Sequence, residues 1–339
     1  MSTTGTNRSC TLASRPVGMS KAENFSSGDA AIEAPGDGQF RVKISHISID
    51  PAMRGWITDG PSYIPPVQIG EVMRAGAIGV IEASNNPKFP EGAAVTGMFG
   101  VQQYAISDGA TCNLVDLSLA PAERWLGGLG MPGMTAYFGT MDILKPKEGE
   151  TMVVSAASGA VGALVGQIGR LHGARVIGIA GGSEKCAYVV DELGFDACID
   201  YKNDDVNAGL KEHAPKRVDM YFESVGGDIG NTVFGHMNTF GRVAVCGLIA
   251  GYNATSPEGL GYNPLAQRSM LVNRLKVQGF IVFDFASRYG EGAKAMVGWM
   301  AEGKLKMKED VRGGGVDAFP DVLNELYTGG NFGKLVLAV

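Results

Sequence analysis

The strongest constraint on the fold is a regular alternation of short apolar segments with helical segments, which begins after about Pro132. The first apolar segment, Met152–Ser155, precedes a helical pattern from about Val161 to His172. Further strands are expected at Arg175–Ala180, Cys198–Asp200, Val218–Glu223 and Arg242–Cys246, and further helices at Ser183–Leu193, Asp204–Ala214 and Ile229–Met237. Such an alternation is typical of βαβ units, which build a parallel sheet covered by helices on both faces. We therefore predict a doubly wound α/β domain.

The segments on either side of this domain have a different character. The first 120 residues show no convincing amphipathic helix, but they contain β-rich runs at Phe40–Ile49, Ala77–Glu82 and Ala93–Met98. These runs predict a compact β-barrel or sandwich-like domain. Near the other end, a strand at Lys276–Val282 and a helix at Glu291–Glu302 precede a β-like segment at Lys334–Val339. We expect this last segment to return to the β-rich domain, so that the doubly wound domain is an insertion.

The overall composition is that of a folded protein and gives no support to a nucleic-acid partner. Apolar residues make up 45% of the chain and charged residues 19%, and the formal net charge is −6. A chain with these values can bury a core, and it carries no basic excess that would attract phosphate backbones. Glycine is unusually frequent, with 50 residues of 339, which predicts many turns and close approaches of the backbone.

The cysteines, the N-terminal residues and the uncharged segment Thr151–Gly169 indicate in which cellular compartment the protein is expected. The five cysteines lie at positions 10, 112, 186, 198 and 246, without a CxxC pair, which argues against a disulfide framework and a thiolate metal site. No apolar segment of the signal-peptide kind separates Arg8 from Arg15. Thr151–Gly169 is uncharged over 19 residues, but only seven of them are large and apolar. A strand, a glycine turn and a helix account for it better than a membrane span. We expect a cytoplasmic protein.

The turn after the first apolar strand has the spacing of a dinucleotide-binding loop. It reads Ser-Ala-Ala-Ser-Gly-Ala-Val-Gly over residues 155–162, so Ala157, Gly159 and Gly162 stand at the three glycine positions of G-x-G-x-x-G. A small residue at 159 lets the backbone approach a pyrophosphate, and the helix N-terminus offers unpaired N–H groups to it. A tight strand-to-helix turn without a ligand is the alternative. The place of the turn in the first βαβ unit favours dinucleotide binding.

The end of the second strand favours NADP over NAD. An NAD-binding protein places Asp or Glu there to accept from the ribose 2′-hydroxyl. Here the strand continues into Gly181-Gly182-Ser183, and Lys185 follows two residues later. The small residues leave room for a 2′-phosphate and Lys185 offers a positive charge, although a solvated lysine is the alternative. Glu184 is better explained as a first-turn residue that complements the helix dipole.

The sequence lacks the ligands of a catalytic zinc site. Zinc alcohol dehydrogenases carry Cys and His ligands in their β-rich domain. The four histidines of this chain, at 46, 172, 213 and 236, are scattered, and Gly70-Glu71 lies in the kind of loop where a zinc enzyme has Gly-His-Glu. We therefore expect no metal in the chemistry. Without zinc, a developing oxyanion needs a hydroxyl donor. Tyr252, which follows the strand Arg242–Cys246, is a candidate for this donor by its position. A tyrosine that only packs against its neighbours is the alternative.

The sequence motifs described above, together with several others, resemble those of a known enzyme family. The chain is similar to the zinc-independent medium-chain dehydrogenase/reductases, and among them to the NADPH-dependent alkenal/one double-bond reductases, which include prostaglandin reductase and the plant alkenal reductases. The resemblance covers nearly the whole chain. It is carried by Arg15–Gly18, Asp50–Gly55, Leu129–Tyr137, Ala156–Gly162, Gly166–Ile168, Gly178–Lys185, Leu193–Asp196, Ile199–Lys202, Val225–Gly227, Cys246-Gly247, Tyr252-Asn253 and Gly330–Lys334.

The resemblance implies an architecture and a set of cofactor contacts. It implies a GroES-like domain at residues 1–130, a Rossmann NADP-binding domain at 131–300 and a return to the first domain at 301–339, usually as a homodimer. The pyrophosphate would be held by Gly159, Ala160, Val161 and Gly162, and the 2′-phosphate by Lys185 and Tyr201. The nicotinamide half would be lined by Ser224, Cys246, Gly247, Tyr252, the expected strand residues Phe280, Ile281 and Val282, and Asn331.

The resemblance also implies the substrate side and two departures from the family. Ala52, Tyr63 and Tyr252 would contact substrate, and Tyr252 matches the family tyrosine near the substrate carbonyl. Ser224 stands where the family usually has Asn, which implies a shorter or water-bridged cofactor contact. Ala52 stands where the family often has Tyr, which implies a roomier pocket.

The activity expected from the resemblance is NADPH-dependent reduction of a carbon–carbon double bond conjugated to a carbonyl. Hydride would be added to the β-carbon, and Tyr252 and the nicotinamide ribose hydroxyl would stabilise the charge that develops on the carbonyl oxygen. Solvent or a relayed proton would then protonate the α-carbon. A zinc-free quinone reductase on the same scaffold is the alternative enzyme. A cofactor-binding protein without turnover is the alternative from another class. The partner we expect is a small-molecule enal or enone, with no nucleic acid and no membrane.

Overall fold

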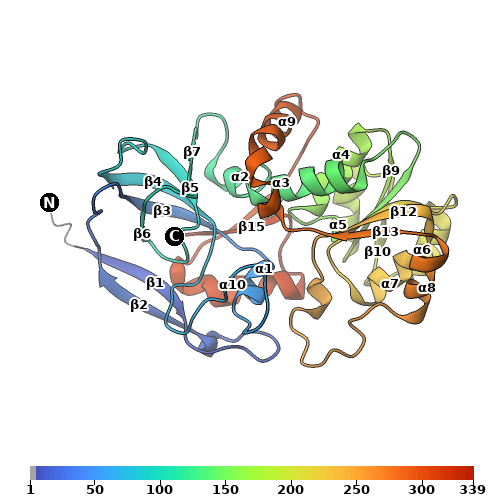
Figure 1. The fold of residues 1–339 in the computed structure, drawn as a ribbon, viewed down its shortest axis with the longest axis horizontal. Helices are drawn as coiled ribbons and strands as arrows, with labels where there is room; N and C mark the ends of the chain where they lie inside the picture. The colour runs from blue at the N-terminus through green and yellow to red at the C-terminus, as the bar shows by residue number, and fades with distance from the viewer. Residues whose placement is uncertain (1–4) are drawn as a thin grey trace. The chain divides into compact units, whose positions relative to one another are not determined.

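The computed structural model describes residues 5–339, which divide into two compact units (Figure 1). The central unit is Gly128–Lys308. The chain-end unit combines the residues up to Gly127 with Glu309–Val339. Each unit has its own sheet, and each is described separately below.

The sheet of the central unit consists of six parallel strands in the order β10-β9-β8-β11-β12-β13. The strands are β8 (Thr151–Ser155), β9 (Arg175–Ala180), β10 (Ala197–Asp200), β11 (Val218–Glu223), β12 (Met237–Val245) and β13 (Lys276–Gly279). From β8 the chain moves outward through β9 to β10, then returns to place β11 on the other side of β8. The strand order therefore reverses between β8 and β11, and such a switch point is where doubly wound sheets bind ligands.

Helices cover both faces of this sheet. They are α3 (Met131–Phe138), α4 (Gly162–Leu171), α5 (Ser183–Ala187), α6 (Val206–His213), α7 (Gly227–Gly235), α8 (Pro264–Val272) and α9 (Tyr289–Ala301). On one face, α6, α7 and α8 bury Leu210, Phe234 and Ala266 in one apolar cluster against the sheet. On the other face, α3 packs with α4 and α9 (Figure 1). The π-helical segments Gly139–Leu144 and Tyr188–Glu192 extend α3 and α5.

The sheet of the chain-end unit is mostly antiparallel and has the order β14-β15-β3-β4-β5-β7, with β6 paired to β3. Its strands are β3 (Phe40–Ser48), β4 (Ala77–Ser84), β5 (Ala94–Gly97), β6 (Tyr104–Ser107), β7 (Asn113–Val115), β14 (Glu309–Arg312) and β15 (Lys334–Ala338). A separate antiparallel pair is formed by β1 (Thr6–Leu12) and β2 (Phe25–Ala31). Because β15 pairs with β3, the last strand of the chain completes a sheet built from its first third.

Three helices of the chain-end unit pack beside these strands. They are α1 (Ala52–Trp56), α2 (Ala122–Leu126) and α10 (Phe319–Thr328). Met53 and Trp56 of α1 and Phe319 and Leu323 of α10 belong to the same buried cluster as the strands. The sequence showed no convincing amphipathic helix in the first 120 residues, and the structure has the short helix α1 there. With five residues, α1 is too short to show a helical period of apolar residues.

One expectation about the central unit is corrected, and one is met. The strand expected over Lys276–Val282 ends at Gly279, and a 3₁₀ helix covers Val282–Arg288. The hydrogen bond from Phe280 N to Val245 O, at 3.4 Å, follows the last pair of the ladder, and Asp284 N then donates to Ile281 O. The uncharged segment Thr151–Gly169 divides into β8, a turn and α4. Among residues 5–339, no helix has the length and apolar character needed to cross a membrane.

Candidate active site

The carboxyl ends of β8, β9, β11 and β12 lie at one edge of the central sheet, and most of the predicted site residues of this unit follow them. Parallel strands end at a common edge, and the chain leaves β8 towards α4 and β11 towards α7. Helices that diverge from two adjacent strands leave a crevice at the switch point.

The turn between β8 and α4 is compact and needs small residues. Ala156 has a positive φ of 52°, and Gly159 N donates to Ala156 O at 3.0 Å. A Cβ atom at Gly162 would overlap that same carbonyl oxygen, so only glycine lets α4 start so close to the turn. Gly159, Ala160, Val161 and Gly162 form the end of the turn and the start of a ten-residue helix. The first turn of a helix leaves its N–H groups without intrahelical partners, which suits a phosphate.

The end of β9 forms a second small-residue turn. Gly182 has a φ of 107°, a conformation that side chains rarely adopt, and Ser183 then begins α5, which carries Lys185. Tyr201 follows β10, and its N–H donates to Ala180 O at 3.1 Å. A Cβ atom at Gly181 would lie 2.8 Å from the Tyr201 hydroxyl, so the phenol rests on this turn. The structure thus brings Tyr201 and the helix bearing Lys185 to the same strand end.

Asp200, which the sequence analysis did not identify, holds this second turn together. Its Oδ1 accepts from the N–H groups of Gly182, at 2.7 Å, and Lys202, at 3.1 Å, and its Oδ2 accepts from Asn203 Nδ2 at 2.7 Å. Burial alone would raise the pKa of Asp200, but these donors together lower it below its usual value. The carboxylate is therefore directed at the protein's own backbone. Its position at the end of a predicted strand was the available signal.

Glu223, at the end of β11, is a second residue that the sequence analysis did not identify. It is fully buried, and its Oε1 accepts from Val225 N at 2.7 Å, from Gly226 N at 2.9 Å and from Ser155 Oγ at 3.2 Å. Ser155 Oγ in turn accepts from Ser224 N at 2.9 Å. The buried carboxylate thus fixes the backbone of residues 224–226 against β8. A charged residue that ends an apolar strand just before Val-Gly-Gly was the signal.

The end of β12 lies next to the same loop. Glu223 O accepts from Cys246 N at 2.8 Å and from Gly247 N at 3.2 Å. Ile249 N donates to Ser224 O at 3.2 Å, so the segments after β11 and β12 are joined. Burial raises the pKa of the Cys246 thiol to about 12, which keeps it neutral at ordinary pH.

Tyr252 folds back over this segment. Its hydroxyl oxygen accepts from Leu248 N at 3.4 Å, and a Cβ atom at Gly247 would lie 3.0 Å from the same oxygen. The ring of Tyr252 is partly exposed. The structure therefore places Ser224, Cys246, Gly247 and Tyr252 together at one end of the sheet, with a phenol among backbone groups.

The three residues after β13 lie beyond the end of that strand and not within it. Phe280 and Val282 are buried, and the Phe280 ring packs edge-on against Phe222 with ring centroids 6.2 Å apart. Ile281 is less buried than its two neighbours. Packing thus occupies the side chains of Phe280 and Val282, which leaves the Ile281 side chain as the candidate for a ligand contact.

The remaining predicted residues, Ala52, Tyr63 and Asn331, belong to the chain-end unit. Ala52 begins α1 and packs against the core of that unit. The hydroxyl oxygen of Tyr63, a half-exposed residue, accepts from Trp56 Nε1 at 2.7 Å. Asn331 precedes β15, and its Nδ2 donates to Gly333 O at 3.1 Å.

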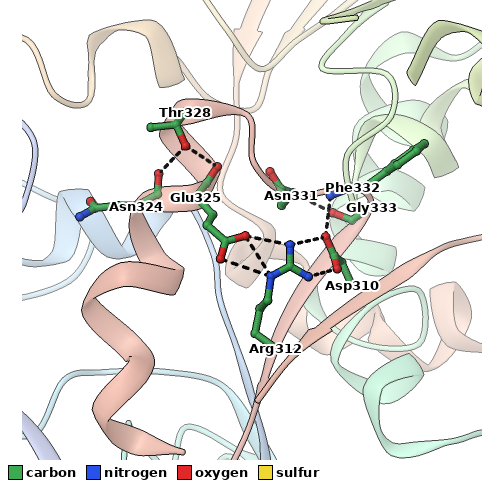
Figure 2. Close-up of polar contacts among 8 residues, drawn as sticks. All are labelled: Asp310, Arg312, Asn324, Glu325, Thr328, Asn331, Phe332 and Gly333. Carbon is green, nitrogen blue, oxygen red and sulfur yellow. Dashed lines mark hydrogen bonds and ion pairs between the residues drawn. The ribbon is translucent and has the colours of Figure 1, made fainter. Parts of the chain in front are cut away.

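The loop that contains Asn331 is held by charged side chains. Figure 2 shows the Arg312 guanidinium between the carboxylates of Glu325 and Asp310. Arg312 Nη2 donates to Glu325 Oε2 at 2.8 Å, and Asp310 Oδ2 accepts from Phe332 N at 2.8 Å. An arginine on β14 therefore connects α10 to the loop 330–333 through one aspartate.

The histidines and the loop at Gly70-Glu71 show no metal-binding arrangement. Glu71 Oε2 accepts from Gln68 N at 2.8 Å, so this carboxylate closes its own turn. Within residues 5–339, no group of three or more His, Cys, Asp or Glu residues is placed to hold a metal ion. The oxygen and nitrogen donors at the sheet edge are backbone N–H groups, a phenol and a lysine, which suit phosphates and a carbonyl and do not form a zinc site.

Comparison with known proteins agrees with this geometry. Residues 8–115 match the family described as "N-terminal domain of oxidoreductase", and residues 160–301 match the family described as "Zinc-binding dehydrogenase". The chain is 45% identical to the NADPH-dependent curcumin reductase of Escherichia coli (strain K12), over 98% of this chain and 97% of that protein. It is 37% identical to the NADP(+)-dependent 2-alkenal reductase of Nicotiana tabacum, over 90% of this chain and 88% of that protein.

A solved structure is equally similar. The crystal structure of CurA from Vibrio vulnificus in complex with NADPH matches with a TM-score of 0.92 and 46% identity, over 98% of this chain and 99% of that chain. These matches confirm the expected fold class, a Rossmann-type parallel sheet combined with an N-terminal GroES-like domain. The chain therefore belongs to the medium-chain dehydrogenase/reductases, in the branch of NADPH-dependent oxidoreductases that contains curcumin reductase and 2-alkenal reductase.

Proposed function

We propose that this protein uses NADPH to reduce the carbon–carbon double bond of α,β-unsaturated aldehydes or ketones. The observation that carries the proposal is the edge of the central sheet, where the start of α4, the turn that leads to Lys185 and Tyr201, and the phenol of Tyr252 follow neighbouring strands. Relatives of this chain that cover nearly all of it are reductases of curcumin and of 2-alkenals.

The residues at this edge fit a phosphorylated dinucleotide. A side chain at Gly162 would overlap Ala156 O, so no atom larger than hydrogen fits between α4 and the turn. The helix α4 therefore begins directly at the candidate pyrophosphate site. In our proposal Gly159, Ala160, Val161 and Gly162 bind the pyrophosphate through backbone N–H groups, and Lys185 and Tyr201 bind the 2′-phosphate. The Asp200 carboxylate beside that turn accepts hydrogen bonds from three protein donors.

The nicotinamide side is assigned to the loops that Glu223 and Asp310 hold. Ser224, Cys246, Gly247, Phe280, Ile281, Val282 and Asn331 are the proposed lining residues. When bound, NADPH supplies the hydride that is added to the β-carbon of the substrate. Ser224 and the residues after β12 would line the ring from segments whose backbone is fixed by hydrogen bonds to β8 and β11.

Tyr252 is the proposed catalytic residue. Addition of hydride to the β-carbon moves negative charge to the carbonyl oxygen of the substrate, and a hydroxyl donor near that oxygen lowers the barrier. The Tyr252 oxygen accepts from Leu248 N, and a phenolic hydroxyl can donate a hydrogen bond as well as accept one. Ala52 and Tyr63 are proposed substrate contacts, with the small Ala52 side chain giving room for a bulky substrate.

Two broader expectations are also part of this proposal. We propose a homodimer, which rests on the resemblance to the family alone. We propose a cytoplasmic protein, which all five cysteines fit because each is a free thiol.

The experiment that tests the function is an NADPH-oxidation assay with an enal, an enone and a quinone, with product identification. The saturated aldehyde or ketone should form from the first two substrates. A saturated carbonyl product excludes the quinone reductase alternative as the main activity. Turnover of the quinone alone would replace the proposal with that alternative. Binding of NADPH without turnover of any substrate would support a cofactor-binding protein.

A further inference from the structure

Two cysteines of the central unit lie in contact beside the candidate 2′-phosphate site. Cys186 is on α5 and Cys198 is on β10, and the Cys198 thiol donates to Cys186 Sγ at a sulfur–sulfur distance of 2.7 Å. A disulfide bond is about 2.05 Å long, so the two sulfur atoms need to approach by only about 0.7 Å to bond. Both side chains are partly exposed, which gives a small oxidant access to them.

The two thiols differ in reactivity. The hydrogen bond from Cys198 lowers the pKa of the Cys186 thiol, and that hydrogen bond together with burial raises the pKa of Cys198. Burial raises the pKa of Cys10 and Cys246 to about 12, and it also raises that of Cys112. Because the thiolate is the nucleophile, Cys186 is the cysteine of this chain best suited to attack an oxidant.

The pair joins the two segments that flank the candidate 2′-phosphate site. Cys186 directly follows Lys185, and its N–H donates to Gly182 O at 3.1 Å. Cys198 lies on the strand that ends at Asp200, which in turn accepts from Gly182 N at 2.7 Å. A covalent bond between α5 and β10 would therefore pull on the helix turn that carries Lys185, at a point where the backbone is already tied to Gly182.

We propose that Cys186 and Cys198 form an oxidisable dithiol, which a hydroperoxide converts to an intramolecular disulfide that weakens NADPH binding. The Cys186 thiolate attacks the hydroperoxide, which gives a sulfenic acid and releases the alcohol, or water when the oxidant is hydrogen peroxide. The Cys198 sulfur then attacks Cys186 Sγ, which forms the S–S bond and releases water. Two thiols together lose two electrons and two protons, and a dithiol reductant reverses the reaction.

The modification site stands on the geometry of the two thiols, whereas its effect on affinity rests on the proposed function. The first test measures the site without NADPH. Protein treated with hydrogen peroxide is denatured, alkylated and analysed by mass spectrometry. We expect a loss of two hydrogen masses, a linked peptide pair containing residues 186 and 198, and full reversal by dithiothreitol.

In Cys198→Ser, the link should be absent and a sulfenic acid should be trapped at Cys186. Cys112→Ser, the control, should behave as wild type.

The second test measures dissociation constants for NADPH and NADH in the reduced and oxidised protein. Partial loss of a charge-assisted contact predicts NADPH binding that is about 3- to 10-fold weaker in the oxidised form, with NADH unchanged. Oxidised Cys198→Ser should retain the affinity of the reduced protein. Absence of the 186–198 link after oxidation would overturn the site, and a link without a change in NADPH affinity would overturn the coupling. Absence of NADPH binding to the reduced protein would instead contradict the proposed function.

Discussion

The Glu223 carboxylate lies directly beneath Gly230, so closely that a Cβ atom at Gly230 would overlap Glu223 Oε2. This carboxylate is fully buried, and its other oxygen accepts from the backbone of residues 225 and 226. Glycine at the first turn of α7 therefore makes room for the group that organises the end of β11. The loop after β11, residues 224–226, therefore depends on a contact between a helix and a strand end, and neither segment predicts this contact by itself.

Gly230→Ala should destabilise the protein and disturb this loop. The added methyl group must displace Glu223 or α7, which costs about 1–3 kcal/mol of unfolding free energy in a packed interior. Gly235→Ala is the matched control, because Gly235 lies on the same helix and nothing is within 4 Å of an added Cβ. The control should change stability by less than about 1 kcal/mol. Urea unfolding of both variants checks this, and equal stabilities would contradict the contact.

Arg312→Met should loosen the loop that contains Asn331. The substitution leaves Asp310 and Glu325 without their shared counter-charge, and Asp310 is the acceptor for Phe332 N. We expect a loss of about 1–2 kcal/mol, since the three groups are partly buried and form a network. Faster hydrogen exchange at residues 330–333 is the specific readout.

Arg170→Met provides the control for this substitution. Arg170 pairs with Asp196 at 2.8 Å on a more exposed surface. Its substitution should lower the free energy of unfolding by less than about 1 kcal/mol. Unchanged exchange at residues 330–333 in Arg312→Met would show that the loop does not depend on the ion pairs.

The regular part of the fold was predictable because burial on both faces leaves a continuous apolar pattern. The bounds of β9 and β11 match the predicted strands, and every other strand predicted from Met152 to Cys246 is present with shifted ends. The helix α3 was missed because all but one of its eight residues are buried, so it shows no amphipathic period. The helix α8 was missed despite its start signal, in which Asn263 caps the helix and Pro264 follows.

The turns of the candidate site were predictable where the backbone requires a small residue, as at Gly162, which lies close to Ala156 O, and at Gly182, which has a positive φ. The site was not predictable where function depends on partners from several strands. Glu223 binds Ser155 at the end of β8 and groups that follow β11 and β12, and its role emerges only when these strands are adjacent. Cys186 and Cys198 show the same difficulty. Their spacing of twelve residues matches no thiol motif, yet parallel packing brings α5 against β10.

Lys185→Ala should discriminate between the two nicotinamide cofactors. Loss of a charge-assisted contact to the 2′-phosphate should weaken NADPH binding by about 1–3 kcal/mol, and NADH, which lacks that phosphate, should be nearly unaffected. Lys211→Ala on the exposed side of α6 is the control and should change neither affinity. Fluorescence titration gives both dissociation constants. Equal losses for the two cofactors would mean that Lys185 supports the structure of α5 and does not read the phosphate.

Chelation should leave the activity unchanged. The histidines at 46, 172, 213 and 236 are scattered, and no three potential ligands cluster within residues 5–339. A catalytic zinc site needs three protein ligands, which this arrangement does not supply. Enone reduction before and after dialysis against EDTA, together with elemental analysis, checks this. Stoichiometric zinc whose removal abolishes activity would overturn the prediction.

Tyr252→Phe tests the chemistry most directly. The substitution keeps the ring and its packing over Gly247 but removes the hydroxyl group that contacts Leu248 N. If the phenol donates to the carbonyl oxygen as charge develops, the loss should fall on kcat more than on KM. Loss of one oxyanion donor can cost ~10²-fold, but the nicotinamide ribose hydroxyl remains as a second donor, so we expect roughly 10-fold.

Measurements of NADPH affinity and of the enone product distinguish the possible roles of Tyr252. NADPH affinity should barely change, because the proposed contact is to substrate. Tyr262→Phe is the control, since Tyr262 packs edge-on against Phe234 on the apolar cluster of α6, α7 and α8, and its kcat should match wild type. A Tyr252→Phe variant with wild-type kcat on enals and enones would make Tyr252 a wall of the pocket. Loss of NADPH binding would place it among the cofactor contacts, because the hydroxyl would then serve binding of the ground state and not the transition state.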